Sequence, residues 1–277
     1  MGKTRHWAVL AAAAALALGF STGAEACVNN GGTGCTSPGG TTSVTWDFCG
    51  GNFGCGNYYG GYWGSVQDHT FSPTSGSGPN TTVHGYSDTG NGGALQSADA
   101  YQYGTNGIGV VNNNGESPTG YPDHSMDNHI NTDSLLFSFD QAVQLTGVEL
   151  GWWTNDSDIT VLAYTGAGTP PSLTSGGYGD LTSNGWSLVG NYNDIGTAPT
   201  AINSGNLVSS YWLVGAANST FGGTSGLADY VKLCSLAGVV PQGPPPPHTV
   251  PAPATLTLLG LGLGLLARRR RREGCAA

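Results

Sequence analysis

The chain has 277 residues, of which 8 are Lys or Arg and 17 are Asp or Glu, giving a formal net charge of −9. Seven of the eight cations lie in two terminal segments, so the stretch from Cys27 to Pro251 holds Lys232 against 15 acidic residues, a net charge of −14. One cation cannot neutralise a phosphate backbone or an anionic membrane surface, which excludes nucleic acid as a partner. Cations and neutral glycans stay compatible with such a surface.

Residues 1–26 are typical of a secretory signal peptide. A basic start (Lys3, Arg5, His6) is followed by an apolar run over residues 7–20, and Ala24 and Ala26 supply the small residues that signal peptidase needs. We therefore expect export through the general secretory route, with cleavage before Cys27. Lipidation of Cys27 is the less favoured alternative, because Ala24 and Glu25 are not the residues that usually precede a lipidated cysteine.

Residues 27–64 form a segment rich in Gly and Cys, which we expect to be a loop-rich cap with one strand at residues 44–48. An exported protein is exposed to an oxidising compartment, so its four cysteines are disulfide candidates (Cys27, Cys35, Cys49, Cys55). The simplest pairing is local, Cys27 with Cys35 and Cys49 with Cys55. Cys234 is then left over as a buried thiol; an intermolecular link, or a bond to one of the N-terminal four, is the alternative. A zinc site is less favoured, because the spacings differ from those of zinc knuckles.

Residues 65–238 predict a single all-β domain, an antiparallel β-sandwich of jelly-roll type. Short alternating apolar segments are separated by Gly, Asn and Pro clusters, with almost no helical periodicity. Further strands are predicted at 81–86, 95–103, 107–111, 159–164, 186–192, 207–216 and 230–236. The densest apolar region begins at Ser134 and has one stripe at Leu135, Phe137 and Phe139, a second that begins at Val143 and Leu145, and a third at Val148, Leu150 and Trp152. The Asn-Gly pairs at 106–107 and 114–115 suit turns that require positive φ. The apolar alternation shifts by one residue at Gly147, which predicts a β-bulge there.

Oxygen-bearing side chains gather just before the most apolar strand. Asp123, Asp127, Asn128 and Asp133 are candidate calcium ligands, since carboxylates and amides are the groups that calcium binds. The alternative, which we favour, is that these residues cap turns and bond their own backbone. The loop at residues 155–158 is a weaker candidate of the same kind.

No catalytic motif is present, so we expect no enzyme, and no cofactor beyond the candidate calcium. Trp152 and Trp153 point to opposite faces of one strand, and we expect one of them to be in the core. The other, with Tyr58, Tyr59, Tyr62 and Trp63, could stack on sugar rings, although packing within the cap is the favoured alternative.

The C-terminal end has three blocks. A proline-rich linker at residues 239–253 ends in Val250-Pro251-Ala252-Pro253, an apolar run at 254–267 follows, and the tail at 268–277 begins with five arginines (Arg268, Arg269, Arg270, Arg271, Arg272). The apolar run predicts a short transmembrane helix, and the arginines keep the tail cytoplasmic. At about 1.5 Å per residue the 16 residues from Ala252 to Ala267 span roughly 24 Å, which is short for a bilayer core of about 30 Å.

This ending resembles the PEP-CTERM sorting signal that an exosortase, a membrane cysteine protease, recognises in exopolysaccharide-producing Gram-negative bacteria. Ala252 stands where the motif usually has Glu, as in a VPAP variant of the exosortase-dependent surface proteins. The segments DHSMDN and SLLFSF to LGWW also look like that family's domain. The resemblance implies transient anchoring in the inner membrane with the body in the periplasm, then release to the cell surface or extracellular matrix. It implies a structural or adhesive role linked to exopolysaccharide or biofilm, with exosortase, signal peptidase and surface glycans as partners. A carbohydrate-binding module is the first alternative, and a secreted glycan hydrolase is the second.

Overall fold

The computed structural model describes residues 42–49, 63–90, 92–122, 124–223 and 226–241. These residues form thirteen strands: β1 (Thr42–Asp47), β2 (Trp63–Ser65), β3 (Thr70–Phe71), β4 (Thr81–Asp88), β5 (Leu95–Tyr103), β6 (Ile108–Val111), β7 (Met126–Asp127), β8 (Asp133–Asn155), β9 (Ile159–Tyr164), β10 (Trp186–Tyr192), β11 (Thr200–Ala201), β12 (Ser209–Ala216) and β13 (Asp229–Val240). Five 3-10 helices of three residues each connect them: η1 (Gly104–Asn106), η2 (Leu173–Ser175), η3 (Tyr178–Asp180), η4 (Thr182–Asn184) and η5 (Ser219–Phe221). The predicted all-β class is therefore confirmed.

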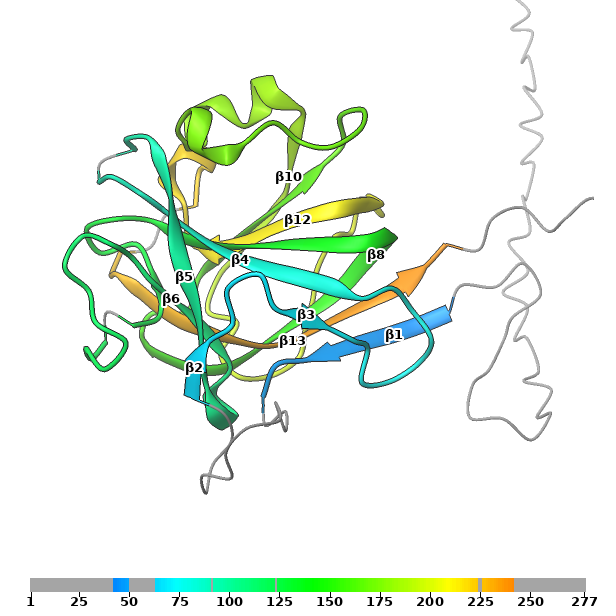
Figure 1. The fold of residues 1–277 in the computed structure, drawn as a ribbon, viewed down its shortest axis with the longest axis horizontal. Helices are drawn as coiled ribbons and strands as arrows, with labels where there is room; N and C mark the ends of the chain where they lie inside the picture. Colours follow the sequence, from blue (N-terminus) through cyan, green and yellow to red (C-terminus); the bar gives the residue numbers. More distant parts are fainter. Residues whose placement is uncertain (1–41, 50–62, 91, 123, 224–225, 242–277) are drawn as a thin grey trace, which may run out of the picture.

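The strands pair antiparallel in the order β1-β13-β6-β5-β4-β8-β12-β9-β10. Two long strands take part in both sections of this sheet. The first part of β8 pairs with β4 and β12, whereas its second part pairs with β13. Likewise β5 pairs first with β4 and then with β6. The sheet thus folds over itself into two layers, with β4, β8 and β12 above β13 and β1 in Figure 1.

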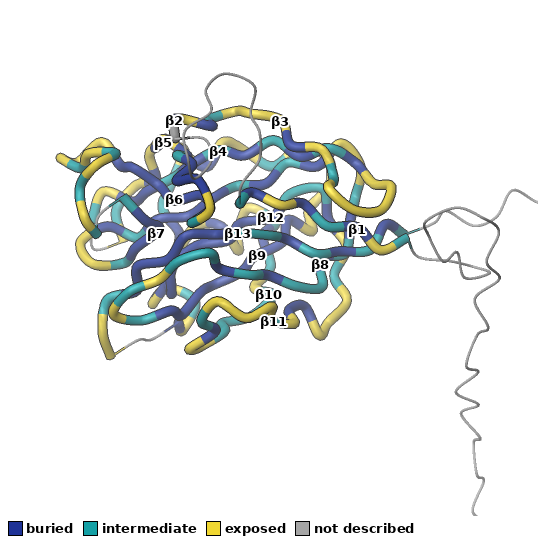
Figure 2. The backbone as a smooth tube through the Cα atoms, turned by 90° about the horizontal axis from the view of Figure 1, so that it is seen from below, coloured by how far each residue is buried: buried dark blue, intermediate teal, exposed yellow. Residues whose placement is uncertain are grey.

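The main core fills the space between the layers, and Figure 2 shows the buried strands enclosed by exposed loops. Alternation in β1 buries Val44, Trp46 and Phe48, as the sequence predicted. The Trp46 indole N–H donates to the Pro79 carbonyl at 2.9 Å, which satisfies its one polar atom. A smaller apolar cluster on the outer side of β9 and β12 is covered by the segment carrying η2, η3 and η4.

Most of the predicted strands are confirmed, and β5, β9 and β10 have the predicted bounds. The predicted β-bulge is also present: Ala237 pairs with Gly147 and Gly238 pairs with Leu145, so Thr146 has no opposite residue. Gly107 and Gly115 have φ of 92° and 102°, as their Asn-Gly turns require. The short strands β2, β3, β7 and β11 were not predicted, because they are too brief to show an alternating pattern.

The predicted pairing of Cys49 with Cys55 is wrong, because Cys49 forms a disulfide with Cys234. The reason is the pairing of β1 with β13, where Asp47 lies opposite Ser235 and the Phe48 amide donates to the Cys234 carbonyl. The sheet therefore includes part of the segment assigned to the cap, and β13 runs to Val240, past the predicted end of the domain. Cys27, Cys35 and Cys55 lie outside the described residues.

The signal peptide, the proline-rich linker with Val250–Pro253, the apolar run and the arginine tail lie outside the described residues. Within the described ranges, no helix has the length and apolar character needed to cross a membrane. The described chain begins at β1 and ends at β13, and these two ends lie side by side because Thr42 pairs with Val240 (Figure 1).

Candidate metal centre

Three carboxylates from separate parts of the chain converge beside the start of β8. Glu116 comes from the loop after β6, Asp127 from β7 and Asp133 from the first position of β8. One carboxylate oxygen of each lies within 4.8 Å of those of the other two. Strand pairing sets this arrangement, because Asp127 lies opposite Tyr230 of β13 and Asp133 opposite Ser87 of β4.

The groups around two of these carboxylates hold them in place. Glu116 accepts hydrogen bonds from Asn112 at both oxygens, one from its backbone N–H at 2.8 Å and one from its side-chain amide. Asp127 Oδ1 accepts from the His129 amide at 3.0 Å. Asn112 and Asp127 are themselves buried, so the carboxylates of Glu116 and Asp127 are held in position by packed surroundings.

Asp133 differs from both, because its side chain is fully buried and neither carboxylate oxygen has a hydrogen-bond partner. The Ser87 hydroxyl and the Asp127 backbone amide lie near enough to Asp133 to favour its charged form and so lower its pKa. The Ser87 hydroxyl, however, donates its hydrogen bond to the Asp88 carbonyl. Burial, followed by the charges of Asp127 and Glu116, raises the pKa of Asp133 well above its usual range. This carboxyl group therefore needs a proton or a cation as its partner.

Asp88 shows how the same fold satisfies a buried carboxylate when a cation is not needed. Its oxygens accept from three backbone amides, those of Gly90 at 2.9 Å, Thr132 at 3.0 Å and Gly92 at 3.3 Å. Asp133 lies in the same region without a comparable set of donors. Asp133 is thus the one buried aspartate of the described ranges in which neither carboxylate oxygen accepts a hydrogen bond.

The structure brings together only part of the calcium set predicted from the sequence. Asp127 and Asp133 meet, Asp123 lies outside the described residues, and Asn128 is directed to Asp229. Glu116 was not predicted, because it follows an Asn-Gly turn and carries no ligand motif; only the pairing of β7 and β8 with their neighbours places it. The favoured expectation of turn capping holds for the Asp127–His129 contact.

A second acidic group consists of Asp156, Asp158 and Asp229, which include residues of the weaker candidate loop. Asp229 accepts from the Asp158 amide at 2.8 Å and from the Asn128 side chain at 2.6 Å. Asp158 accepts from the Asp194 amide at 2.7 Å. Burial raises the pKa of Asp229 to about 6 and raises that of Asp158. Backbone and amide donors already satisfy these carboxylates, so their arrangement is explained by the local structure.

Lys232 is the one Lys or Arg of the described ranges, and it is buried on β13. Its Nζ lies 3.6 Å from the ring centre of Trp152 and 5.0 Å from that of Tyr103. Burial lowers the pKa of Lys232 to about 7, because desolvation disfavours the charged ammonium form. Trp152 covers this amine while Trp153, on the opposite face, is 43% exposed, so neither of the two is a fully buried core residue.

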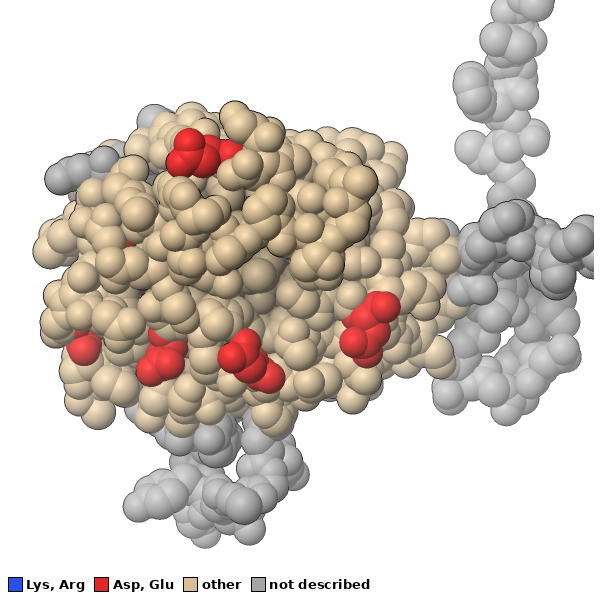
Figure 3. Space-filling model, turned by 45° about the horizontal axis from the view of Figure 1, so that its top comes forward, with Lys and Arg blue, Asp and Glu red and all other residues tan. Residues whose placement is uncertain are grey.

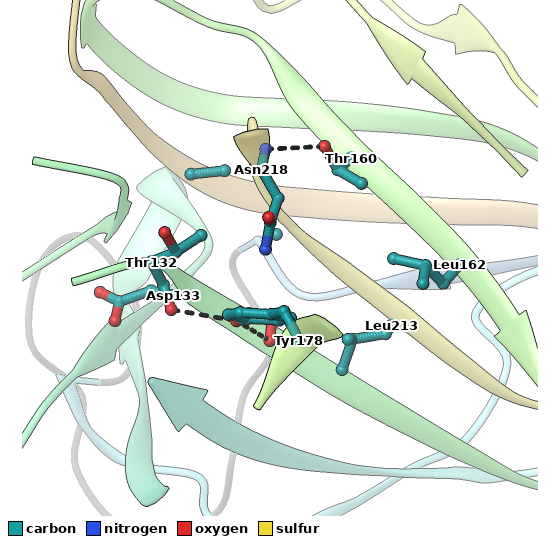
Figure 4. Close-up of a pocket in the computed structure, with 10 residues that line it drawn as sticks. Thr132, Asp133, Thr160, Leu162, Tyr178, Leu213 and Asn218 are labelled. Atoms are coloured by element: carbon teal, nitrogen blue, oxygen red, sulfur yellow. Dashed lines mark hydrogen bonds between the residues drawn. The ribbon is translucent and has the colours of Figure 1, made fainter. Parts of the chain in front are cut away.

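A small cavity with space for about one water molecule lies between β8, β9 and β12. The Tyr178 hydroxyl donates to the Thr132 carbonyl at 3.0 Å and bonds the Ser134 hydroxyl at 2.8 Å. Figure 4 shows the Asp133 carboxylate directed away from Tyr178. Asp133 is among the residues that line this cavity, but its carboxylate is directed to the other side, where it lies near those of Glu116 and Asp127.

Comparison with protein families, curated proteins and solved structures found no match to this chain. The face in Figure 3 shows dispersed acidic groups and no Lys or Arg, in agreement with the burial of Lys232. Such a surface attracts cations and repels polyanions.

Proposed function

We propose that this chain is an exported cell-surface protein of the PEP-CTERM type, sorted by an exosortase at Val250–Pro253. Its body is a sandwich of jelly-roll type with a structural or adhesive role in the exopolysaccharide matrix. It is anchored briefly in the inner membrane, with the body periplasmic, before release to the surface. Its role is to bind or support, not to catalyse.

The Cys49–Cys234 disulfide is the observation that supports export most directly. Disulfides persist in exported proteins and are rare where thiols are kept reduced. This one joins Cys49, two residues after β1, to Cys234 of β13, so it closes the domain covalently after secretion. The signal-peptide pattern at the start of the chain and the three-block ending agree with the same route.

The geometry of the two ends suits a tethered domain. Because Thr42 pairs with Val240, the chain enters and leaves the sheet at one end of the body (Figure 1). A C-terminal anchor therefore leaves the opposite end and the loops around it available to matrix partners.

The test is the intact mass of protein recovered from the outer surface of cells with and without an exosortase gene. We expect loss of residues 1–26 in both strains, and loss of the tail after about Pro253 only with exosortase. Pro251→Ala combined with Pro253→Ala should block the second cut. Pro244→Ala combined with Pro245→Ala, in the same proline-rich run, is the matched control and should be processed normally. Retention of the arginine tail in both strains would refute the sorting proposal.

Glycan binding is a second candidate, supported by exposed aromatic rings. Tyr121 is 70% exposed, and its ring centre lies 5.9 Å from that of Trp152 and 6.3 Å from that of His124. Aromatic faces of this kind stack on the apolar faces of sugars. Tyr121→Ala should reduce retention on the cell's exopolysaccharide in affinity electrophoresis, whereas Ile130→Ala, at an equally exposed site, should not. Asp133 and Asp229 are fully buried, so neither offers a glycan hydrolase a carboxylate that its substrate can reach.

A further inference from the structure

We propose that Glu116, Asp127 and Asp133 bind one Ca²⁺ ion, which fastens the long connection between β6 and β8 to the sheet. The inference stands on the geometry of these three carboxylates and does not depend on how the protein is sorted.

The three carboxylates concentrate negative charge in a small volume. Three carboxylates within 4.8 Å of one another repel strongly when ionised, and the one Lys of the described ranges is held by Trp152 and Tyr103 instead. A divalent cation among the three oxygens would offset this repulsion directly.

Neither carboxylate oxygen of the fully buried Asp133 has a hydrogen-bond partner. Burying a carboxylate in this way costs free energy, and the other buried aspartates avoid that cost by accepting hydrogen bonds from N–H groups. Asp133 is aimed at Asp127 and Glu116, the two other oxygen donors of the cluster. Its oxygens are thus placed as metal ligands are placed.

The spacing and chemistry of these ligands favour calcium over magnesium and zinc. Calcium binds carboxylate oxygens at about 2.3–2.6 Å, so two ligands of one ion lie at most about 5 Å apart, which accommodates the observed spacing. Magnesium bonds at about 2.0–2.1 Å and usually keeps several waters, which suits a buried all-carboxylate site less well. Zinc prefers nitrogen and sulfur ligands, and this group has only oxygens.

The ion would join the connection between β6 and β8 to the sheet. Residues 112–132 form this connection, and β7, with two residues, is the one strand among its described residues. Glu116 lies in the first half of that connection, and Asp127 and Asp133 lie at its far end. One shared ion therefore closes the connection into a loop fixed against β4 and β13.

The test compares calcium binding and thermal unfolding of the full chain, with CaCl2 alone as the ligand and EGTA as the metal-free condition. Extracellular calcium sites bind with Kd of about 0.1–1 mM, so 10 mM calcium should raise the Tm of the wild type by roughly 3–10 °C. Calorimetry should show one site per chain, with at least tenfold weaker binding of Mg²⁺.

Asp133→Asn should abolish the calcium-dependent shift. In EGTA this variant should unfold at the same Tm as the wild type or higher, because the amide needs neither a proton nor a cation to be neutral. The order of the two proteins then reverses when calcium is added. Glu116→Gln, at a less buried position, is the second variant if Asp133→Asn fails to fold, and it should weaken calcium binding at least tenfold. Asp140→Asn, an exposed aspartate of β8, is the matched control and should respond as the wild type does.

Three results would overturn the proposal. Calcium could leave both the Tm and the calorimetric heat of the wild type unchanged, as expected if Asp133 is neutral and shares a proton with Asp127. Asp133→Asn and the wild type could respond equally to calcium. Asp156→Asn could abolish the response while Asp133→Asn retains it, which would move the ion to the second acidic group.

Discussion

Replacing both Cys49 and Cys234 by Ser should lower the free energy of unfolding by several kcal/mol. The two cysteines are 185 residues apart, and the loop-closure relation for a loop of that length gives about 5 kcal/mol, most of it through the unfolded chain. A domain of this kind is stable by roughly 5–15 kcal/mol, so the double variant should lose a large fraction of its stability.

Urea unfolding followed by tryptophan fluorescence measures the effect, because Trp46 and Trp212 are fully buried. The wild type without reductant should have a clearly higher midpoint than the double Ser variant, and reductant should move the wild type toward the variant. Reductant should leave the midpoint of the variant nearly unchanged, which is the internal control. A difference below about 1 kcal/mol would contradict the entropic argument. A non-reduced peptide map that lacks the Cys49–Cys234 link would contradict the pairing itself.

Two further predictions concern close packing and buried charge. Gly151→Ala should destabilise the fold by a few kcal/mol, because a Cβ there would lie 2.6 Å from the Asn106 carbonyl oxygen and 2.8 Å from Cys49 Sγ. Gly179→Ala, where a Cβ meets nothing within 4 Å, is the control in the same urea assay. Lys232→Met should remove a pH dependence of the free energy of unfolding. The pKa of Lys232 in the folded chain is about 7, below the ordinary 10.5, so between these two values the unfolded chain binds one more proton than the folded chain. The stability of the wild type therefore rises with pH across this range. The rise is at most about 1.4 kcal/mol per pH unit, and the ring faces of Trp152 and Tyr103 reduce it by favouring the ammonium. Parallel stability curves for the two proteins from pH 6 to 9 would show that the amine does not titrate in this range.

Local pattern was enough to predict most of the strands, because side-chain alternation and turn chemistry act over a few residues. The Gly147 bulge is the clearest case, since the shift from Leu145 to Val148 is visible in the sequence and appears again in the pairing with β13. The Asn-Gly turns are equally local. Local pattern did not show that the apolar stripes between Leu135 and Trp152 form one continuous strand, β8.

Long-range pairing was not predictable from the same information. Nothing near Cys49 shows that its neighbour in space is Cys234, because that contact follows from placing β1 against β13. The candidate metal ligands were likewise predicted only in part. Asp127 and Asp133 are close in sequence and were predicted together, whereas Glu116 joins them only through the folded sheet.

The closeness of the two chain ends has a mechanical consequence. A pull on the chain beyond Val240 is carried by β13, which is hydrogen-bonded to β1 on one side and β8 on the other. The residues after Cys234 can separate from these neighbours one by one, but the link to Cys49 then transfers the load to β1. Under tension the body can lengthen by only a few residues at its C-terminal end before the Cys49–Cys234 bond stops it. If the domain is held through its C-terminus as proposed, flow or shear would load that attachment before it unfolds the core.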